Sequence, residues 1–244
     1  MNNNNTLTKV KMLVKKPSLL INKIKRIYFY ILEVFFVIID KISLVTYSNK
    51  ILFIDAGSNL GQGCKFFSFF FCSKNFYFEL FEPNKNCEEY LNKFCCSKGK
   101  NFTFHNCAIS TENKRINFYG VDESEGGLTS EGGSIVENHN SAIYALNKNR
   151  NIIQVNAIDF KKYILLRKDE YNKIIIKMDI EGAEVDVLED LIESGTMQHI
   201  SIIYIEFHSV YKIGEERMLT IKRENNIIHK IKKDFPNVKL RIWH

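Results

Sequence analysis

The feature that most constrains this chain is a short apolar run that leads directly into a glycine-containing turn. Residues 51–54 (I-L-F-I) are uninterruptedly apolar, which is typical of a central parallel strand covered on both faces. The turn D-A-G-S-N-L-G follows at 55–61, and residues 62–71 predict a helix. Glycine lets the backbone approach a ligand that a Cβ would obstruct. A strand, a glycine turn and a helix form the opening unit of a nucleotide-binding α/β fold.

The carboxylate of Asp55 in this turn indicates which kind of cofactor the turn could bind. The spacing is G-x-N-x-G rather than G-x-G-x-x-G, and Asp55 stands two residues before the first glycine. A carboxylate repels a pyrophosphate, which disfavours an NAD-dependent oxidoreductase, whereas it suits a cofactor with sulfonium and ammonium groups. Taken alone, the turn also fits a tight strand–helix connection capped by Asn59.

A second acid follows the next predicted strand. Residues 76–81 are apolar and aromatic, and they end in Glu82-Pro83-Asn84. A carboxylate at this point in the fold is placed to accept hydrogen bonds from both ribose hydroxyls. The alternative is an acid in the first turn of a helix. The two acids together favour a cofactor site over either alternative.

Further apolar runs predict the rest of an α/β fold, with a mostly parallel central sheet and helices on both faces. The central strand 173–178 ends at Asp179 and precedes a helix that closes at Ser194-Gly195. Other strands are expected at 102–109, 115–119 (pairing at a sheet edge), 152–159 (an edge strand), 202–205 and 239–243. The long polar stretch 120–141 predicts a functional or disordered loop.

The chain divides by composition into a basic N-terminal extension, 1–49, and a main domain, 50–244. Residues 1–8 are polar and predict disorder, and the segment 27–47 holds thirteen Ile, Leu, Val and Phe. Glu33 and Asp40 fall on one face of a helix over this segment. We expect first a helix docked on the domain, second a helix lying on a membrane surface through 9–47, and third a spanning helix, which the charges oppose.

The distribution of charge limits which partners the chain is expected to bind, and the use of cysteine indicates the cellular compartment. The net charge of +6 comes from the two ends, because residues 1–26 and 221–244 each carry seven Lys and Arg against few acids. The centre is therefore net acidic, and nucleic-acid binding by the core is not favoured. The six cysteines form no C-x-x-C pair, so we expect free thiols of a cytoplasmic protein rather than a disulfide or zinc framework.

A series of motifs across residues 50–210 resembles one family. In order they are D-A-G-S-N-L-G, F-E-P-N, N-C-A-I-S, K-M-D-I-E-G-A-E and E-F-H. Together they are similar to the FkbM-type methyltransferases. The resemblance implies a Rossmann-like class I fold, S-adenosyl-L-methionine as cofactor, and O-methylation of a hydroxyl on a sugar, glycan or small molecule. Residues 1–49 lie outside the resemblance, and the oligomeric state is left open.

The resemblance and the strand ends together assign a cofactor site. The turn is expected to hold the methionine end of the cofactor, Glu82 the ribose, and two further residues the adenine. The cofactor residues are thus Asp55, Gly57, Asn59, Gly61, Glu82, Asn106 and Ala108.

Charged residues after the later strands are the candidates for catalysis. Asp179, Glu206 and His208 are expected to contact the substrate hydroxyl and assist its deprotonation, with His208 the group suited to act as a base near neutrality. Glu181 and Ser134 are the candidate substrate contacts. A divalent metal bridging Asp179 and Glu206 is an alternative that no His/Cys cluster demands, and no metal is expected.

Two other functions stay open at this point. One is a non-catalytic, membrane-associated scaffold that binds S-adenosylmethionine. The other is a nucleic-acid methyltransferase, which is disfavoured because the chain has neither an N/D-P-P-Y/F/W motif nor a Pro-Cys nucleophile.

Overall fold

The computed structural model describes residues 17–45, 50–71, 73–119, 133–137 and 152–243, and the chain divides into two compact units at Thr46 and Tyr47. The first unit is the helix α2 (Pro17–Val45), which contains most of the apolar segment predicted to be helical. Large apolar side chains are exposed along it, including Ile27, Tyr30 and Ile42. Among the described helices, none combines the length and the apolar character needed to cross a bilayer. The predicted disorder of 1–8 falls outside the described residues.

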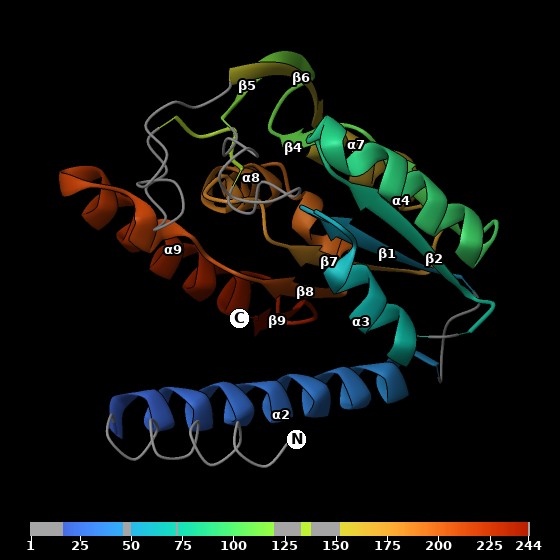
Figure 1. The fold of residues 1–244 in the computed structure, drawn as a ribbon, viewed down its shortest axis with the longest axis horizontal. Coiled ribbons are helices and arrows are strands. Elements are labelled where there is room, and N and C mark those ends of the chain that lie inside the picture. The colour runs from blue at the N-terminus through green and yellow to red at the C-terminus, as the bar shows by residue number, and fades with distance from the viewer. Residues whose placement is uncertain (1–16, 46–49, 72, 120–132, 138–151, 244) are drawn as a thin grey trace, which may run out of the picture. The chain divides into compact units, whose positions relative to one another are not determined.

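The second unit is built on a six-stranded sheet in which every neighbouring pair is parallel (Figure 1). The strand order is β3-β2-β1-β7-β8-β9. The bounds are β1 (Ile51–Ala56), β2 (Phe76–Phe81), β3 (Phe102–His105), β7 (Lys173–Met178), β8 (Ile202–Ile205) and β9 (Lys239–Ile242). The predicted parallel sheet is confirmed, as are the strand ends at Phe81, Met178 and Ile205. β1 runs two residues beyond its predicted end at Ile54 and includes Asp55 and Ala56.

Helices cover both faces of this sheet, as expected, and the two faces differ in chemistry. The helices are α3 (Gln62–Phe70), α4 (Lys85–Lys98), α7 (Phe160–Arg167), α8 (Glu184–Glu193) and α9 (Gly214–Asp234), with short 3-10 turns at Thr196–His199 and Ser209–Tyr211. Side chains alternate along a strand, so odd and even positions meet different helices. On β1, Phe53 packs against Phe67 of α3, with ring centroids 4.8 Å apart, whereas Leu52 and Ile54 join the aliphatic core with α7, α8 and α9.

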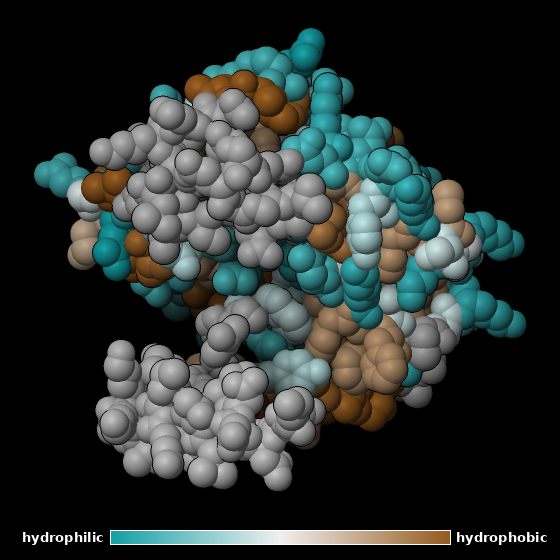
Figure 2. Space-filling model, in the orientation of Figure 1, coloured by the Kyte–Doolittle hydropathy of each residue, from teal (hydrophilic) through white to brown (hydrophobic). Residues whose placement is uncertain are grey.

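The amphipathic pattern of α4 shows why a helix forms there. Its N-cap Asn84 accepts a hydrogen bond from the Asn86 N–H, and its buried side chains, Cys87, Leu91, Phe94 and Cys95, recur at helical spacing. The opposite side of the helix is polar, and Figure 2 shows hydrophilic residues over this part of the molecule. The helix therefore caps one face of the sheet.

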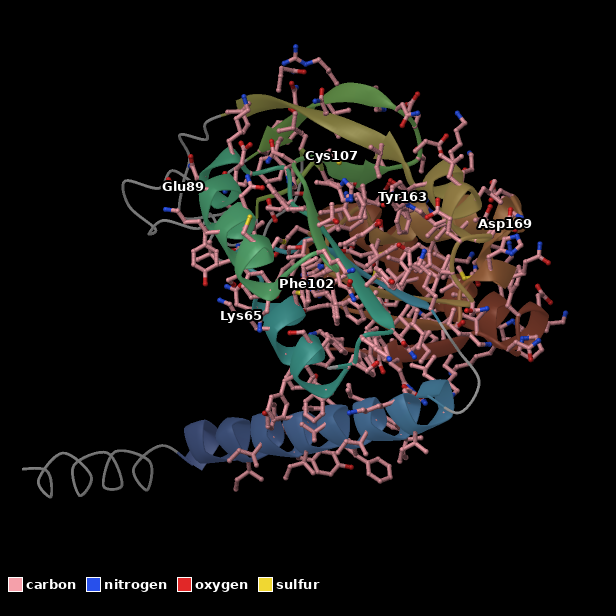
Figure 3. All side chains as sticks on the ribbon, turned by 90° about the vertical axis from the view of Figure 1, so that its right-hand side faces the viewer. Lys65, Glu89, Phe102, Cys107, Tyr163 and Asp169 are labelled. Atoms are coloured by element: carbon pink, nitrogen blue, oxygen red, sulfur yellow. The ribbon has the colours of Figure 1, made fainter. Side chains whose placement is uncertain are left out.

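The predicted strand 102–109 is wrong as a single element. β3 ends at His105, and β4 (Ala108–Ser110) belongs to a second, three-stranded sheet in the order β4-β6-β5. The chain leaves the main sheet because the Asn106 amide donates to the Glu82 carbonyl and the Cys107 N–H donates to the His105 carbonyl. Figure 3 labels Phe102 near the start of β3 and Cys107 at this crossing.

The position predicted for the segment 152–159 is also wrong. β6 (Ile152–Asp159) was expected at an edge, but it is the central strand, parallel to β4 and antiparallel to β5 (Lys114–Tyr119). β5 itself lies at the edge of this sheet, as expected. Alternation of exposed and buried residues in β6 does not distinguish an edge strand from the middle of a small sheet with one open face. Of the predicted 120–141 loop, only 133–137 are described.

The strand order reverses between β1 and β7, and here the backbone segments that follow these two strands approach very closely. Ala56 pairs with Met178, and a Cβ placed on Gly57 would lie 1.8 Å from the Asp179 carbonyl oxygen. Gly57 also has φ +77°, a conformation that side chains with a Cβ rarely adopt. Glycine is therefore required at this position for two separate reasons.

We expect Gly57→Ala to destabilise the protein far more than a positive φ alone explains. Gly214→Ala is the matched control, because Gly214 has φ +60° with nothing within 4 Å of a built Cβ. The control is expected to cost about 1–2 kcal/mol of unfolding free energy, the strain of a left-handed non-glycine residue. Gly57→Ala adds a backbone clash, so urea unfolding is expected to show a loss several-fold larger. Equal losses in the two variants would contradict the close approach.

Candidate functional site

The carboxyl ends of four neighbouring parallel strands bring polar side chains to one edge of the sheet. Asp55 is the last residue but one of β1, and the glycine turn follows this strand. Glu82 follows β2, Asp179 follows β7, and Glu206 follows β8. The order of these strands reverses between β1 and β7, and open α/β sheets bind ligands in the crevice at such a point. The predicted site residues therefore gather around one location of the fold.

A buried lysine that the sequence analysis did not single out links the two central strands. Lys177 of β7 is 4% exposed, and its Nζ lies 3.4 Å from Asp55 Oδ1 and 3.1 Å from Asp179 Oδ2. It also donates a hydrogen bond of 3.0 Å to the Gly57 carbonyl. Burial lowers the pKa of Lys177, but the charges of Asp179 and Asp55 outweigh this and raise it, so the ammonium stays charged.

Asp55 faces the interior and caps the helix that follows the turn. Its side chain is fully buried, and Oδ2 accepts a 3.0 Å hydrogen bond from the Cys64 N–H in the first turn of α3. Burial raises the pKa of Asp55, and Lys177 partly offsets the increase. The helix N-terminus, which commonly binds phosphate, is here satisfied by a carboxylate of the chain itself. Gly63 makes room for this arrangement, since its built Cβ would lie 3.3 Å from Asp55 Oδ1.

The turn between β1 and α3 uses three left-handed residues. Gly57, Asn59 and Gly61 have φ values of +77°, +45° and +71°. Asn59 is the unusual one, because residues with a Cβ seldom adopt this conformation, although asparagine tolerates it best. The alternation turns the backbone so that the Asn59 N–H points at Glu82, which draws two predicted cofactor residues together.

Glu82 joins the turn to the end of β2. Its Oε2 accepts a hydrogen bond from the Asn59 N–H and its Oε1 accepts one from the Asn84 N–H, both at 2.8 Å. Burial raises the pKa of Glu82 to about 7, although these two N–H groups favour the charged form. Each oxygen keeps a further lone pair, so the carboxylate has the capacity to accept two more hydrogen bonds.

The two residues predicted near adenine differ in position. The Asn106 amide lies beside Glu82, to whose backbone carbonyl it donates a 3.0 Å hydrogen bond. Ala108 is buried in the small sheet, where it pairs with Ala157. Asn106 is thus held within the group of site residues, while Ala108 supports the sheet next to it.

A second cluster lies after β7 and β8. His208 is 4% exposed, and its Nε2 lies 3.6 Å from Asp179 Oδ1, 3.5 Å from Glu181 Oε2 and 3.9 Å from Glu206 Oε1. All four were predicted as catalytic or substrate residues, and the fold brings them together. Ser134, the other predicted substrate contact, donates a 2.5 Å hydrogen bond to the Glu181 carbonyl and so adjoins this cluster.

Glu184, which was not among the predicted site residues, holds the cluster in place. It is 1% exposed, and its carboxylate accepts hydrogen bonds from the Ile180 and Gly182 N–H groups. Its Oε1 also lies 2.8 Å from His208 Nδ1. A carboxylate that already accepts two backbone hydrogen bonds needs a donor from the ring, so the proton sits on Nδ1 and Nε2 faces the other acids.

Burial and the neighbouring carboxylates change the pKa values of the side chains in this cluster. Burial raises the pKa of Glu181 to about 7, opposed by His208, and burial followed by the Asp179 charge raises the pKa of Glu206. Burial lowers the pKa of His208, but the hydrogen bond to Glu184 and the surrounding carboxylates outweigh it and raise it to about 10. In this environment the imidazole keeps its proton at neutral pH, which is not the state of a general base.

Lys177 and Glu184 are the two site residues that sequence reasoning missed. Both lie in the K-M-D-I-E-G-A-E motif. A lysine between Ile176 and Met178, near the end of a central strand with an apolar interior, is itself a signal, because a buried lysine needs acidic partners. An acid five residues beyond Asp179 carries no comparable signal, since acids in a first helical turn are common.

The fold and this edge define an open α/β protein with a parallel main sheet, in which an acidic turn lies where the strand order reverses. The methyltransferase FkbM domain matches residues 55–228 of the chain. The chain therefore belongs to the FkbM methyltransferase family.

Comparisons with curated proteins and with solved structures give less information about this chain. No curated protein matches the chain. A crystal structure of methyltransferase FkbM from Methylobacillus flagellatus KT shares 14% sequence identity with it, at a TM-score of 0.42. That match covers 75% of this chain and 38% of the other, so the chain spans well under half the length of that protein.

We expect Lys177→Met to destabilise the protein by about 3–5 kcal/mol, the cost of removing one partner from a buried ion pair. Asp55 and Asp179 then lose the cation between them. Lys173→Met is the control, because Lys173 begins the same strand and is exposed. Denaturant unfolding measures both, and the double variant Lys177→Met/Asp55→Asn is expected to recover part of the loss. A Lys177→Met protein as stable as the control would show that the buried charge is not needed.

Proposed function

We propose that this chain is a methyltransferase that transfers the methyl group of S-adenosyl-L-methionine to a hydroxyl oxygen of a sugar, a glycan or a small molecule. The single observation that carries the proposal is the pairing of an acid-capped turn with the Glu82 carboxylate across the ends of β1 and β2. The cofactor, when bound, supplies an electrophilic methyl group on a sulfonium with a good neutral leaving group.

The turn suits a cationic amino-acid end better than a pyrophosphate. The first-turn N–H of Cys64 is already satisfied by Asp55, and a phosphate at this helix end would meet that carboxylate. Asp55 is buried, so it acts on a cofactor through the field of its charge and through the shape of the turn. Direct contacts are left to the backbone of Gly57, Asn59 and Gly61.

Glu82 fits a ribose. Both of its oxygens keep a lone pair after bonding the Asn59 and Asn84 N–H groups, and two neighbouring hydroxyls match two such acceptors. The same two N–H groups fix the orientation of the carboxylate before a ligand arrives, which lowers the entropic cost of binding. Asn106 supports this position through the Glu82 carbonyl.

The acids after β7 and β8 fit a hydroxyl-bearing acceptor. Asp179, Glu181 and Glu206 are partly exposed, and carboxylates accept hydrogen bonds from hydroxyl groups. They orient the acceptor oxygen, and the partly exposed carboxylates are the groups to receive its proton. A polyanionic acceptor such as nucleic acid would meet this negative edge unfavourably.

We expect Glu82→Ala to weaken binding of S-adenosylhomocysteine, the product form of the cofactor, by about 1.5–3 kcal/mol, the value of hydrogen bonds to a charged group. Glu89→Ala is the control, because Glu89 lies on the neighbouring α4, pairs only with Lys93 among described residues, and projects outward (Figure 3). Calorimetry on both variants measures the difference. Tight NAD binding in place of the methionine nucleoside would overturn the proposal.

The same contact is expected to depend on pH. The pKa of Glu82 is raised to about 7, so the carboxylate becomes protonated as the pH falls through that value. A protonated group accepts ribose hydrogen bonds less well, and the ionised fraction falls about tenfold from pH 8 to pH 6. Cofactor affinity is expected to drop by up to this factor in the wild type and to vary less in Glu82→Gln. An identical pH profile in the two proteins would assign the titration to another group.

We also propose that the N-terminal helix mediates contact with an apolar surface, either of the main domain or of a membrane. Exposed apolar side chains along α2, among them Ile31, Phe35 and Ile38, are typical of a surface that binds another apolar surface.

Deletion of residues 1–26 is expected to leave a folded, cofactor-binding protein. If the helix docks on the domain, deletion of 1–47 lowers the thermal midpoint or causes aggregation. If it binds lipid, this deletion instead abolishes co-sedimentation with anionic vesicles and leaves stability intact.

A further inference from the structure

We propose that Asp179, Glu206 and His208 form a binding site for one divalent cation, of the Mn²⁺ type, that holds the acceptor hydroxyl. This inference rests on the proposed function, since the acceptor oxygen is what the cation would bind. The three side chains come from the ends of two adjacent strands, β7 and β8, and each offers one ligand atom.

The spacing of the ligand atoms fits a small cation. All three lie within 4.8 Å of one another, and His208 Nε2 is 3.6 Å from Asp179 Oδ1 and 3.9 Å from Glu206 Oε1. These separations exceed those of a good hydrogen bond, about 2.7–3.2 Å. Ligands bound at about 2.1 Å to an octahedral ion lie about 3.0 Å apart at right angles and about 4.2 Å apart when opposite. The two distances from His208 Nε2, 3.6 Å and 3.9 Å, fall inside this range.

The ring of His208 is oriented as metal-binding histidines are. Glu184, which is not one of the three ligands, lies 2.8 Å from Nδ1 and is itself fixed by the Ile180 and Gly182 N–H groups. A carboxylate on the far nitrogen sets the tautomer, turns Nε2 toward the site and raises its basicity as a ligand. Because His208 is 4% exposed, the ring has little freedom to turn away.

The charge of the cluster also favours a cation. Asp179, Glu181, Glu184 and Glu206 surround the His208 imidazole. Among the described residues, Lys177 is the lysine paired with this cluster, and it approaches Asp179 on its other oxygen. A divalent ion compensates the excess negative charge. Carboxylates suit Mn²⁺ and Mg²⁺, while imidazole suits later transition metals, so a mixed set of two carboxylates and one imidazole points to Mn²⁺.

A cation bound at this site would define how the neighbouring carboxylates act on the acceptor hydroxyl. Glu181 Oε2 lies 3.5 Å from His208 Nε2 and belongs to the same group, so it is placed beside a ligand bound to the cation. A metal lowers the pKa of an oxygen bound to it and orients that oxygen. The acceptor hydroxyl would then release its proton to a neighbouring carboxylate. The cation would displace the proton from His208 Nε2 to solvent, so the imidazole would serve as a ligand and not as a base.

The test is Mn²⁺ binding to the full chain after treatment with a chelator. Calorimetry is expected to find one Mn²⁺ per chain in the wild type. His208→Ala and Glu206→Gln are each expected to weaken binding at least about tenfold, and Glu184→Gln by about 10–100-fold through its effect on the ring. Glu193→Gln is the control, because Glu193 is an exposed acid at the end of the same helix, α8.

A spectroscopic readout separates a ligand from a structural role. Pulsed electron paramagnetic resonance of the Mn²⁺ complex is expected to show coupling to an imidazole nitrogen in the wild type and in Glu193→Gln, and none in His208→Ala. If His208→Ala does not fold, weakened binding in a folded Glu206→Gln tests the site instead. Wild-type protein without a stoichiometric Mn²⁺, or with unchanged Mn²⁺ binding in Glu206→Gln, would overturn the inference.

Binding of S-adenosylhomocysteine on the same samples keeps the two proposals apart. Protein that binds the nucleoside but not Mn²⁺ contradicts the cation site alone and leaves His208 as a charged group among carboxylates. Protein that binds Mn²⁺ but not the nucleoside contradicts the proposed function and removes the stated role of the cation.

Discussion

A buried cation shared by two strands is the interaction on which this edge of the molecule depends. Lys177 bonds Asp55 and Asp179, the acids at or just beyond the ends of β1 and β7, and also the Gly57 carbonyl. Without it, two carboxylates would face each other beside a tight backbone crossing, at a large electrostatic cost. The ion pairs therefore compensate the negative charge that lies where the strand order reverses.

The rest of the site is arranged around this junction in two groups. On the β1–β2 side, Glu82 receives the Asn59 and Asn84 N–H groups and presents acceptors of the kind a ribose requires. On the β7–β8 side, Glu184 fixes the loop after β7 and the ring of His208. Each group is oriented by main-chain N–H donors, so the carboxylates are positioned before any ligand binds.

Sequence alone predicted most of the main sheet, because its strands are buried on both faces and appear as uninterrupted apolar runs. The motifs D-A-G-S-N-L-G and K-M-D-I-E-G-A-E placed Asp55 and Asp179 at strand ends, where the structure has them. The small sheet could not be predicted in this way. Its formation depends on the Asn106 side chain and on pairing between β4 and β6, segments about forty residues apart. Local periodicity gives no information on such contacts.

The chemistry of the site was harder to predict than its position. The pKa suited to a base was assigned to His208 from its ordinary value, but that value changes when Glu184, Glu181 and Asp179 surround the ring. The most direct test of the proposed cofactor site is a crystal structure of the chain with S-adenosylhomocysteine. We expect the ribose hydroxyls to lie on the Glu82 carboxylate and the amino-acid end to lie at the turn 57–61. A nucleoside bound elsewhere, or with its ribose away from Glu82, would contradict this assignment.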